Sequence, residues 1–125
     1  MKAPLTLVIC LGCLFACGCE STYTPGKGPS QMEMNRQAAA EVEKAENKMQ
    51  KIFSELRIRL DAAGSAKLDA SQAAWLAYRK AEAESYADQY RGGSIAPMIH
   101  SASVADTTER RIGQLQFQLD GLKQR

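Results

Sequence analysis

The sequence predicts an all-α protein: an antiparallel, up-down-up bundle of three helices that follows a signal peptide and a flexible linker. Three observations predict this fold. The residues after position 30 are rich in Ala, Gln, Glu, Lys and Leu, which favour helices. Their apolar residues recur at intervals of three and four, the period of an amphipathic helix. Gly64 and the pair Gly92-Gly93 divide these periodic stretches into three.

Residues 1–19 have the pattern of a signal peptide. Lys2 precedes an apolar run at residues 5–15, which is shorter than the roughly 20 residues that a membrane-spanning helix needs. Its end is similar to the lipobox of bacterial lipoproteins, because a small residue precedes Cys17 and another precedes Cys19. We therefore predict a lipoprotein signal peptide with Cys17 or Cys19 as the lipidated residue. An ordinary cleaved signal peptide is the alternative.

All four cysteines lie in this leader. Cys10 and Cys13 have the spacing of a redox or metal pair, but they lie inside the apolar run and outside any βαβ context. The residues that follow contain no cysteine, so no disulfide is expected in the folded domain. Residues 20–29 contain two prolines and two glycines, and they are predicted to be a flexible linker between the anchor and a domain at 30–125.

The first helix is predicted to start at Ser30, which has Glu33 at the spacing of a capping box. No proline or glycine follows until Gly64, which we expect to end the helix as a C′ residue. This helix would be the longest and would overhang the second. Its apolar stripe consists of Ala38, Val42, Ala45, Met49, Ile52, Phe53, Leu56 and Leu60.

A second helix is predicted from Lys67 or Asp69 to about Tyr90. It contains the only tryptophan, Trp75, and three of the four tyrosines, so we expect these aromatic rings to form the centre of the core. Arg79 lies one turn beyond Trp75 on the same side. Arg79 is either buried and paired, or extended along the apolar seam to water. The apolar side comprises Leu68, Trp75, Leu76, Tyr78, Ala83, Tyr86 and Tyr90.

Residues 91–94 predict a chain reversal, because Gly92 and Gly93 permit positive φ angles. Ser94 is the expected cap of a third helix, which runs to about Leu122 with Pro97 in its first turn. A kink is possible at residues 106–109, where polar residues weaken the pattern. The stripe of this helix consists of Ile95, Met98, Ala102, Ala105, Thr108, Ile112, Leu115, Leu119 and Leu122.

Three short motifs in residues 31–117 resemble the LprI-like lysozyme-inhibitor domain, a small secreted or lipid-anchored helical domain of bacteria. The first is Gln-x-x-Trp-x-x-Tyr-Arg at 72–79, the second is Tyr-x-Gly-Gly-Ser-Ile at 90–95, and the third is Thr-x-x-Arg-x-x-x-Leu at 108–115. The candidate structural or binding residues are Gln72, Trp75, Tyr78, Arg79, Gly92, Gly93, Ser94, Thr108 and Arg111.

The resemblance has one departure. Members typically carry cysteines where this chain has Gln37, Ala83 and Ser103, so we expect packing alone to hold this fold. The motif residues are not expected to be catalytic. We expect a polar network between the second and third helices, formed by Gln72, Arg79, Thr108 and Arg111.

The net charge of +2 does not favour a nucleic-acid-binding protein. We predict no enzyme, no cofactor and no metal site, because the only histidine, His100, has no plausible nucleophile beside Asp106 or Glu109. The resemblance implies a protein-binding lipoprotein of the bacterial envelope, facing the periplasm or in the outer membrane, or else secreted to the periplasm. It would inhibit a lysozyme by inserting residues 91–94 into the cleft. The alternative is an envelope assembly partner that uses an apolar strip on an overhanging first helix.

Overall fold

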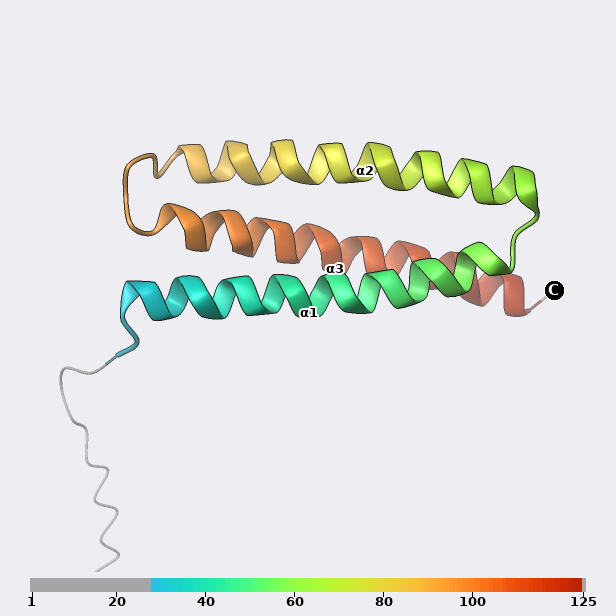
Figure 1. Ribbon diagram of the computed structural model, residues 1–125, viewed down its shortest axis with the longest axis horizontal. Helices are drawn as coiled ribbons and strands as arrows, with labels where there is room; N and C mark the ends of the chain where they lie inside the picture. Colours follow the sequence, from blue (N-terminus) through green and yellow to red (C-terminus); the bar gives the residue numbers. More distant parts are fainter. Residues whose placement is uncertain (1–27, 125) are drawn as a thin grey trace, which may run out of the picture.

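The computed structural model describes residues 28–124, which form three helices joined by short connections. The helices are α1 (Gln31–Ile58), α2 (Ala62–Asp88) and α3 (Ala96–Lys123). Figure 1 shows them side by side, with α1 and α3 parallel and α2 antiparallel to both. The described residues contain no strand, and the all-α, up-down-up bundle is confirmed. The predicted signal peptide at 1–19, with Cys17 and Cys19, and the linker as far as residue 27 lie outside the described residues.

The three helices have nearly equal lengths of 28, 27 and 28 residues. The prediction that the first helix is longest and overhangs the second is therefore wrong. It failed because Gly64 does not end α1 but lies in the first turn of α2. Asp61 is the N-cap of α2, and its Oδ1 accepts a hydrogen bond of 2.7 Å from the backbone N–H of Gly64. This cap starts α2 before the predicted Lys67 or Asp69.

The starts of α1 and α3 differ in how they are capped. The predicted cap of α1 is confirmed, because Ser30 Oγ accepts a hydrogen bond of 3.2 Å from the N–H of Glu33. The predicted cap of α3 is wrong: Ile95 occupies the N-cap position, and no side chain bonds the helix start. The backbone oxygen of Ser94 instead accepts a bond of 3.1 Å from the side-chain amide of Asn35 in α1.

The helix α3 is continuous through residues 106–109, so the weakened apolar pattern does not break the helix. Two threonines in this stretch donate their hydroxyls to backbone oxygens within the helix. The hydroxyl of Thr107 donates to the backbone oxygen of Ser103 at 2.8 Å, and that of Thr108 donates to Val104 at 2.7 Å. This return of a hydroxyl to the carbonyl four residues earlier is compatible with a helix.

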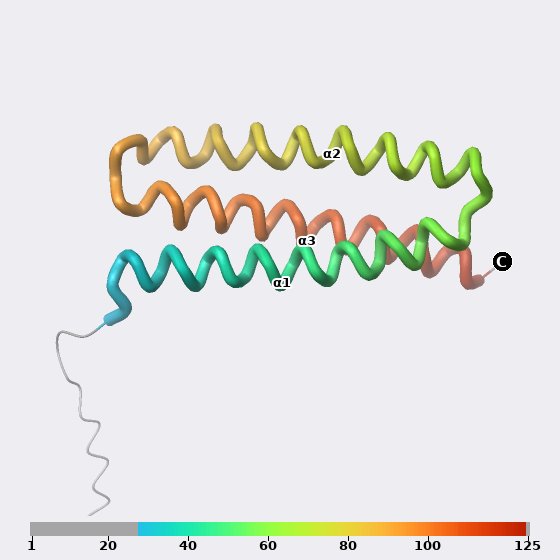
Figure 2. Tube along the Cα trace, viewed as in Figure 1, coloured from blue at the N-terminus to red at the C-terminus, as the bar shows by residue number. Residues whose placement is uncertain are grey.

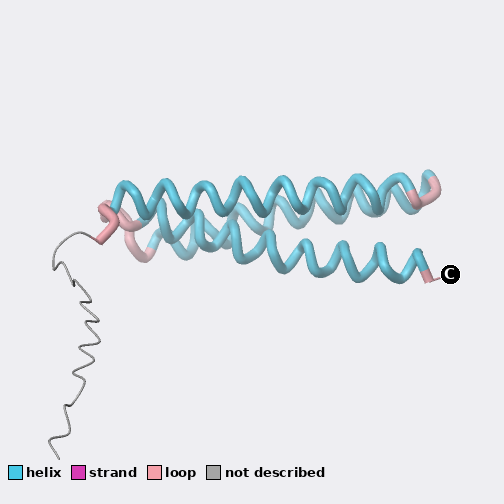
Figure 3. Tube along the Cα trace, turned by 90° about the horizontal axis from the view of Figure 1, so that it is seen from below, coloured by secondary structure: helices cyan, strands magenta, loops and turns pink. Residues whose placement is uncertain are grey.

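The core forms around α3, which packs against both other helices, while α1 and α2 have few contacts with each other. Figure 2 shows that the two connections lie at opposite ends of the bundle, and Figure 3 shows helix over nearly all of the length between them. The buried core cluster is aliphatic, with Leu115 0% exposed. It comprises Met49, Leu56, Leu68, Ile112, Leu115 and Leu119, with Trp75 and Phe53 among its partly buried neighbours.

The prediction that the aromatic residues of the second helix form the centre of the core is wrong for its tyrosines. Tyr78 is 53% exposed, Tyr86 is 51% exposed and Tyr90 is 43% exposed. Because α2 packs mainly on α3, only a narrow strip of its surface is covered, and the tyrosines flank that strip. A half-exposed phenol keeps its hydroxyl in water while the ring contacts protein.

Ion pairs join the helix ends where α1 meets α2 and α3. The guanidinium of Arg57 donates to both carboxylate oxygens of Asp69, at 2.9 Å from Nε and 3.0 Å from Nη2. These hydrogen bonds hold the pKa of Asp69 below its usual value. A hydrogen bond from Lys123 is the main cause that lowers the pKa of Glu55 on the same end.

These shifts predict a loss of stability in acid. A carboxyl whose folded-state pKa is lowered contributes stability above its unfolded pKa, and this contribution disappears as the pH falls through the folded value. We expect Asp69→Asn to unfold at lower urea than the wild type at pH 7, and the two midpoints to converge below about pH 4. Urea titrations at a series of pH values measure this. Glu43→Gln, at an exposed residue without an ion pair in the described chain, is the matched control. A constant difference at all pH values would contradict the prediction.

The aliphatic core gives a second prediction. Leu115→Ala removes a fully buried side chain and is expected to lower the free energy of unfolding by about 2–5 kcal/mol. Phe117→Ala, two residues away on α3, removes a larger side chain that is 81% exposed, and it should change stability by less than about 0.5 kcal/mol. Equal losses in the two variants, measured by urea unfolding, would show that the core is misplaced.

Candidate functional site

Two arginines lie close to the indole ring of Trp75 on α2. The guanidinium carbon of Arg79, four residues later on α2, lies 5.0 Å from the centre of the indole ring. That of Arg111 on α3 lies 5.9 Å from the same centre. Both distances fall within the range of a cation–π interaction, in which the negative face of the ring attracts a cation. The ring is half-buried and packs against the core cluster.

Arg79 connects all three helices. Its Nη1 atom lies 2.9 Å from the carboxylate of Glu46 on α1 and donates a hydrogen bond of 3.0 Å to the hydroxyl of Thr108 on α3. Only 14% of the Arg79 side chain is exposed. Of the two alternatives that the sequence left open, the structure therefore shows the paired arginine, because its charge is compensated by a carboxylate.

Arg111 is more deeply buried, at 6% exposure, and its bonding partners are all neutral. Its Nε donates to Gln72 at 3.0 Å, its Nη2 to Ser71 at 3.0 Å and its Nη1 to Gln114 at 3.3 Å. Burial lowers the pKa of Arg111, because removal from water disfavours the charged form. None of the buried side-chain nitrogen or oxygen atoms in the described residues lacks a hydrogen-bond partner.

This cluster is suited to holding helices together and not to catalysis. Its guanidiniums donate hydrogen bonds and cannot accept them, and its amides and hydroxyls have no free base beside them, because the Glu46 carboxylate is paired with Arg79. Asp106 is paired with Arg110 at 2.8 Å and Glu109 with Lys48 at 3.4 Å, so neither carboxylate serves His100. Within residues 28–124, no group of three His, Cys, Asp or Glu side chains is arranged to hold a metal ion.

The turn at residues 91–94 is exposed and hydrogen-bonded at both ends. Gly92 has the predicted positive φ, at 79°, whereas Gly93 does not. The N–H of Gly93 donates to the oxygen of Tyr90 at 2.9 Å, and that of Ala96 donates to Gly93 at 3.2 Å. The Arg91 side chain is 79% exposed and pairs with Asp88. The turn therefore has a defined shape and lies at the end of the bundle where α1 begins (Figure 1).

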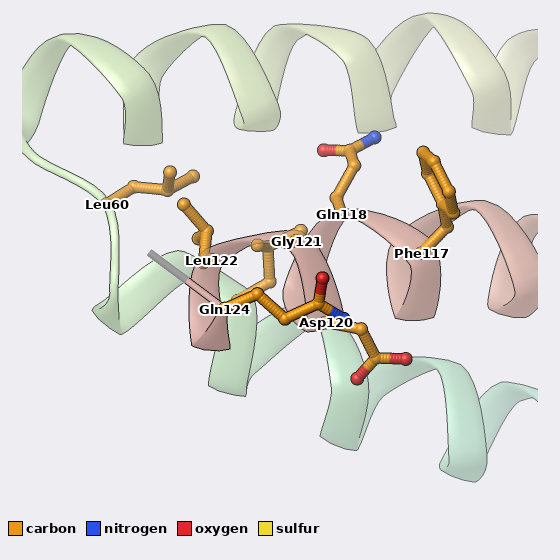
Figure 4. A pocket seen from close by; sticks show the side chains of 8 residues that line it. Leu60, Phe117, Gln118, Asp120, Gly121, Leu122 and Gln124 are labelled. Carbon is orange, nitrogen blue, oxygen red and sulfur yellow. The ribbon is translucent and has the colours of Figure 1, made fainter.

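A hollow of about 490 Å³ lies at the opposite end of the bundle. Figure 4 shows Leu60 from the α1–α2 connection and Leu122 from α3 pointing toward each other, with Phe117 standing apart from them. Asp120 is the one charged residue in its lining. A single carboxylate beside aliphatic side chains does not make a catalytic or metal site.

The structure brings together five of the nine candidate residues, namely Gln72, Trp75, Arg79, Thr108 and Arg111. Tyr78 is not among them, because its side chain is exposed on another face of α2. Gly92, Gly93 and Ser94 lie in the turn. Glu46, Ser71 and Gln114 also belong to the cluster but were missed. Glu46 directly follows Ala45 of the apolar stripe, a position that predicts an exposed carboxylate, so the apolar pattern carried no signal for a partner of Arg79.

Comparisons with known proteins relate the chain to one family. The family model described as lysozyme inhibitor LprI matches residues 21–115. An uncharacterized protein of Rhizobium meliloti (strain 1021) is 35% identical over 103 residues, which cover 71% of this chain and 73% of that protein. No solved structure matches. Among the helices of the described part, none is long and apolar enough to cross a membrane.

The polar cluster gives a third prediction. Arg79→Ala separates Glu46 from its partner and removes one cation from Trp75, so we expect a loss of about 1–3 kcal/mol in the free energy of unfolding. Thr108→Val keeps the side-chain shape but removes the shared hydroxyl, and about 1–2 kcal/mol is expected. Because the two groups are bonded to each other, the double variant should lose less than the sum.

Trp75 is the only tryptophan, so its fluorescence reports on this cluster during urea unfolding. Arg36→Ala, at a side chain that is 78% exposed, is the matched control and should leave stability unchanged. An Arg79→Ala variant with the wild-type melting temperature would remove the stabilising role of the cluster.

Proposed function

Because the chain belongs to the LprI lysozyme inhibitor family, we propose that it is a protein-binding module of the bacterial envelope that inhibits a lysozyme. The single observation that supports this function most strongly is the family match over residues 21–115, which includes all nine motif residues. A helical bundle with an interior polar cluster that lacks a nucleophile is compatible with a binding role. Inhibition would then depend on surface residues.

The 91–94 turn is the surface that we assign to the enzyme. A lysozyme cleft is lined by two carboxylates, so a narrow segment with an exposed cation is complementary to it. The two glycines keep the turn narrow, and its backbone hydrogen bonds reduce the conformational freedom that is lost on binding. Arg91 would exchange the carboxylate of Asp88 for one of the enzyme, because a guanidinium binds carboxylates with two parallel hydrogen bonds.

We also propose that the protein is exported and then lipidated at Cys17 or Cys19. The apolar run and the small residues before each cysteine support this processing. Acyl chains on the new amino terminus would hold the domain at a membrane, because each buried CH₂ contributes about 0.8 kcal/mol. Mass spectrometry of the mature amino terminus tests this: an acylated cysteine is expected, and a free amino terminus after residue 19 would contradict it.

The alternative role as an envelope assembly partner depended on an overhanging first helix. The equal helix lengths remove that overhang, and the exposed Met32 and Ile58 lie at opposite ends of α1. An apolar strip of the predicted kind is not found on the described part of α1. The inhibitor therefore remains the favoured function.

The proposed function gives a fourth prediction. The mature chain should inhibit a lysozyme in a cell-wall clearing assay, and Arg91→Glu should raise the concentration for half-inhibition at least about tenfold, because two carboxylates would face a third. Lys67→Glu makes the same charge change near the start of α2, at the far end from the turn, and should inhibit like the wild type. No inhibition by the wild type at a large molar excess would end the proposal. Equal inhibition by the Arg91→Glu variant would exclude the turn as the binding surface.

A further inference from the structure

A hollow of about 310 Å³ lies in the groove between α2 and α3. Its lining comes from these two helices alone, with Tyr78, Glu82 and Tyr86 on the α2 side and Ile99, Asp106 and Arg110 on the α3 side. It is separate from the tryptophan–arginine cluster, with which it shares no residue. The two exposed tyrosines that the sequence analysis assigned to the core are therefore part of an open groove.

The three α2 residues of the groove are spaced four apart and so lie on one face of the helix. Tyr78 and Tyr86 are about half exposed, and Glu82 lies between them, partly buried. Glu82 makes no ion pair with any residue in the described chain. Asp106 on the other wall is paired with Arg110 at 2.8 Å, so these two charges compensate each other. The groove is left with one uncompensated negative charge flanked by two aromatic rings.

We propose that this groove binds a Lys or Arg side chain of a protein partner. A cation placed beside Glu82 would lie near a carboxylate and two aromatic rings, and the faces of such rings attract cations most when water is partly excluded. The apolar side chain of Ile99 would contact the methylene stem of that residue, since Lys and Arg bury their stems while the charged end remains polar. A neutral or acidic side chain would leave the Glu82 carboxylate uncompensated.

The groove extends toward the turn to which the proposed function assigns the enzyme, because Tyr86 lies two residues before the end of α2 at Asp88. Tyr86 precedes Arg91 by five residues, which corresponds to about 8 Å along a helix. Tyr78 lies about 12 Å further along the same helix axis. The turn and the groove together thus extend over about 20 Å, comparable to the width of a protein–protein interface of standard size. Where the partner is a lysozyme, which rests on the proposed function, the groove would hold a basic residue at the rim of its cleft.

Binding of a cationic side chain is measured directly by titrating the mature chain with tetralysine in an NMR experiment. We expect shifts of the ring signals of Tyr78 and Tyr86 that weaken as salt is added, since exposed charges are screened. Glu82→Gln should weaken the binding about three- to tenfold, and Glu82→Lys should abolish it. Tyr86→Phe keeps the ring and should bind like the wild type, whereas Tyr86→Ser should bind more weakly.

The matched control is Glu84→Lys, the same charge change two residues along α2 at an exposed side chain that pairs with Lys80. It should bind tetralysine like the wild type, apart from a small change in the salt dependence. If Glu84→Lys and Glu82→Lys weaken tetralysine binding equally, net charge alone causes the loss of binding, and the proposal is overturned. Shifts of the groove signals with protein concentration, in the absence of peptide, would assign the groove to a second copy of the chain and also overturn it.

The tetralysine titration does not involve a lysozyme, so its result is separate from that of the inhibition assay. Binding of the peptide without inhibition of lysozyme would support the groove as a cation-binding site and contradict the proposed inhibitor function. If tetralysine does not bind and the Glu82→Lys variant inhibits lysozyme like the wild type, the inhibitor function is supported and the cation-binding groove is contradicted.

Discussion

Burial of one face of α3 against both other helices is the constraint on which the fold depends. Leu115 and Leu119 on this face are almost completely buried, and α1 and α2 have few contacts with each other. Each outer helix is therefore held mainly by its contact with α3. The contact with α1 is the more extensive, with Leu56 and Met49 among its buried members. The contact with α2 has fewer aliphatic residues, so α2 depends more on other interactions.

The polar cluster provides those interactions for α2. Arg79 reaches from α2 to both neighbours, and Arg111 reaches from α3 to two side chains of α2. Apolar packing alone would permit α2 to slide along α3, because aliphatic contacts have little directional preference. Hydrogen bonds from two guanidiniums, which lie 5.0 Å and 5.9 Å from the centre of the Trp75 ring, specify one register. Every buried side-chain nitrogen and oxygen atom in the described part has a hydrogen-bond partner, and complete satisfaction is what makes such an interior cluster compatible with stability.

The period of the apolar residues was sufficient to predict three helices and their up-down-up order, since it depends only on which residues avoid water. The ends of the helices depend on single hydrogen bonds. Ser30 was predicted correctly, whereas the bond from Gly64 to Asp61 reversed the role that was expected of Gly64. The proximity of Gln72, Arg79, Thr108 and Arg111 was predicted, but Glu46 was missed because its position beside the stripe predicts an exposed carboxylate. The groove was missed because Tyr78 and Tyr86 were assigned to the core, and a sequence period does not specify how much of the α2 surface α3 covers.

The parallel course of α1 and α3 has a consequence for a lipidated chain. The hydrogen bond between Asn35 and Ser94 shows that the linker joins the folded domain beside the α2–α3 turn. A lipid on Cys17 or Cys19 would then attach the molecule to the bilayer at the end that carries the 91–94 turn, with Phe117 and the opposite end directed away from the bilayer. Residues 20–29 reach at most about 35 Å when fully extended. The length of the linker would set the distance between the domain and the lipid headgroups. Only an enzyme that enters this space parallel to the membrane could then bind.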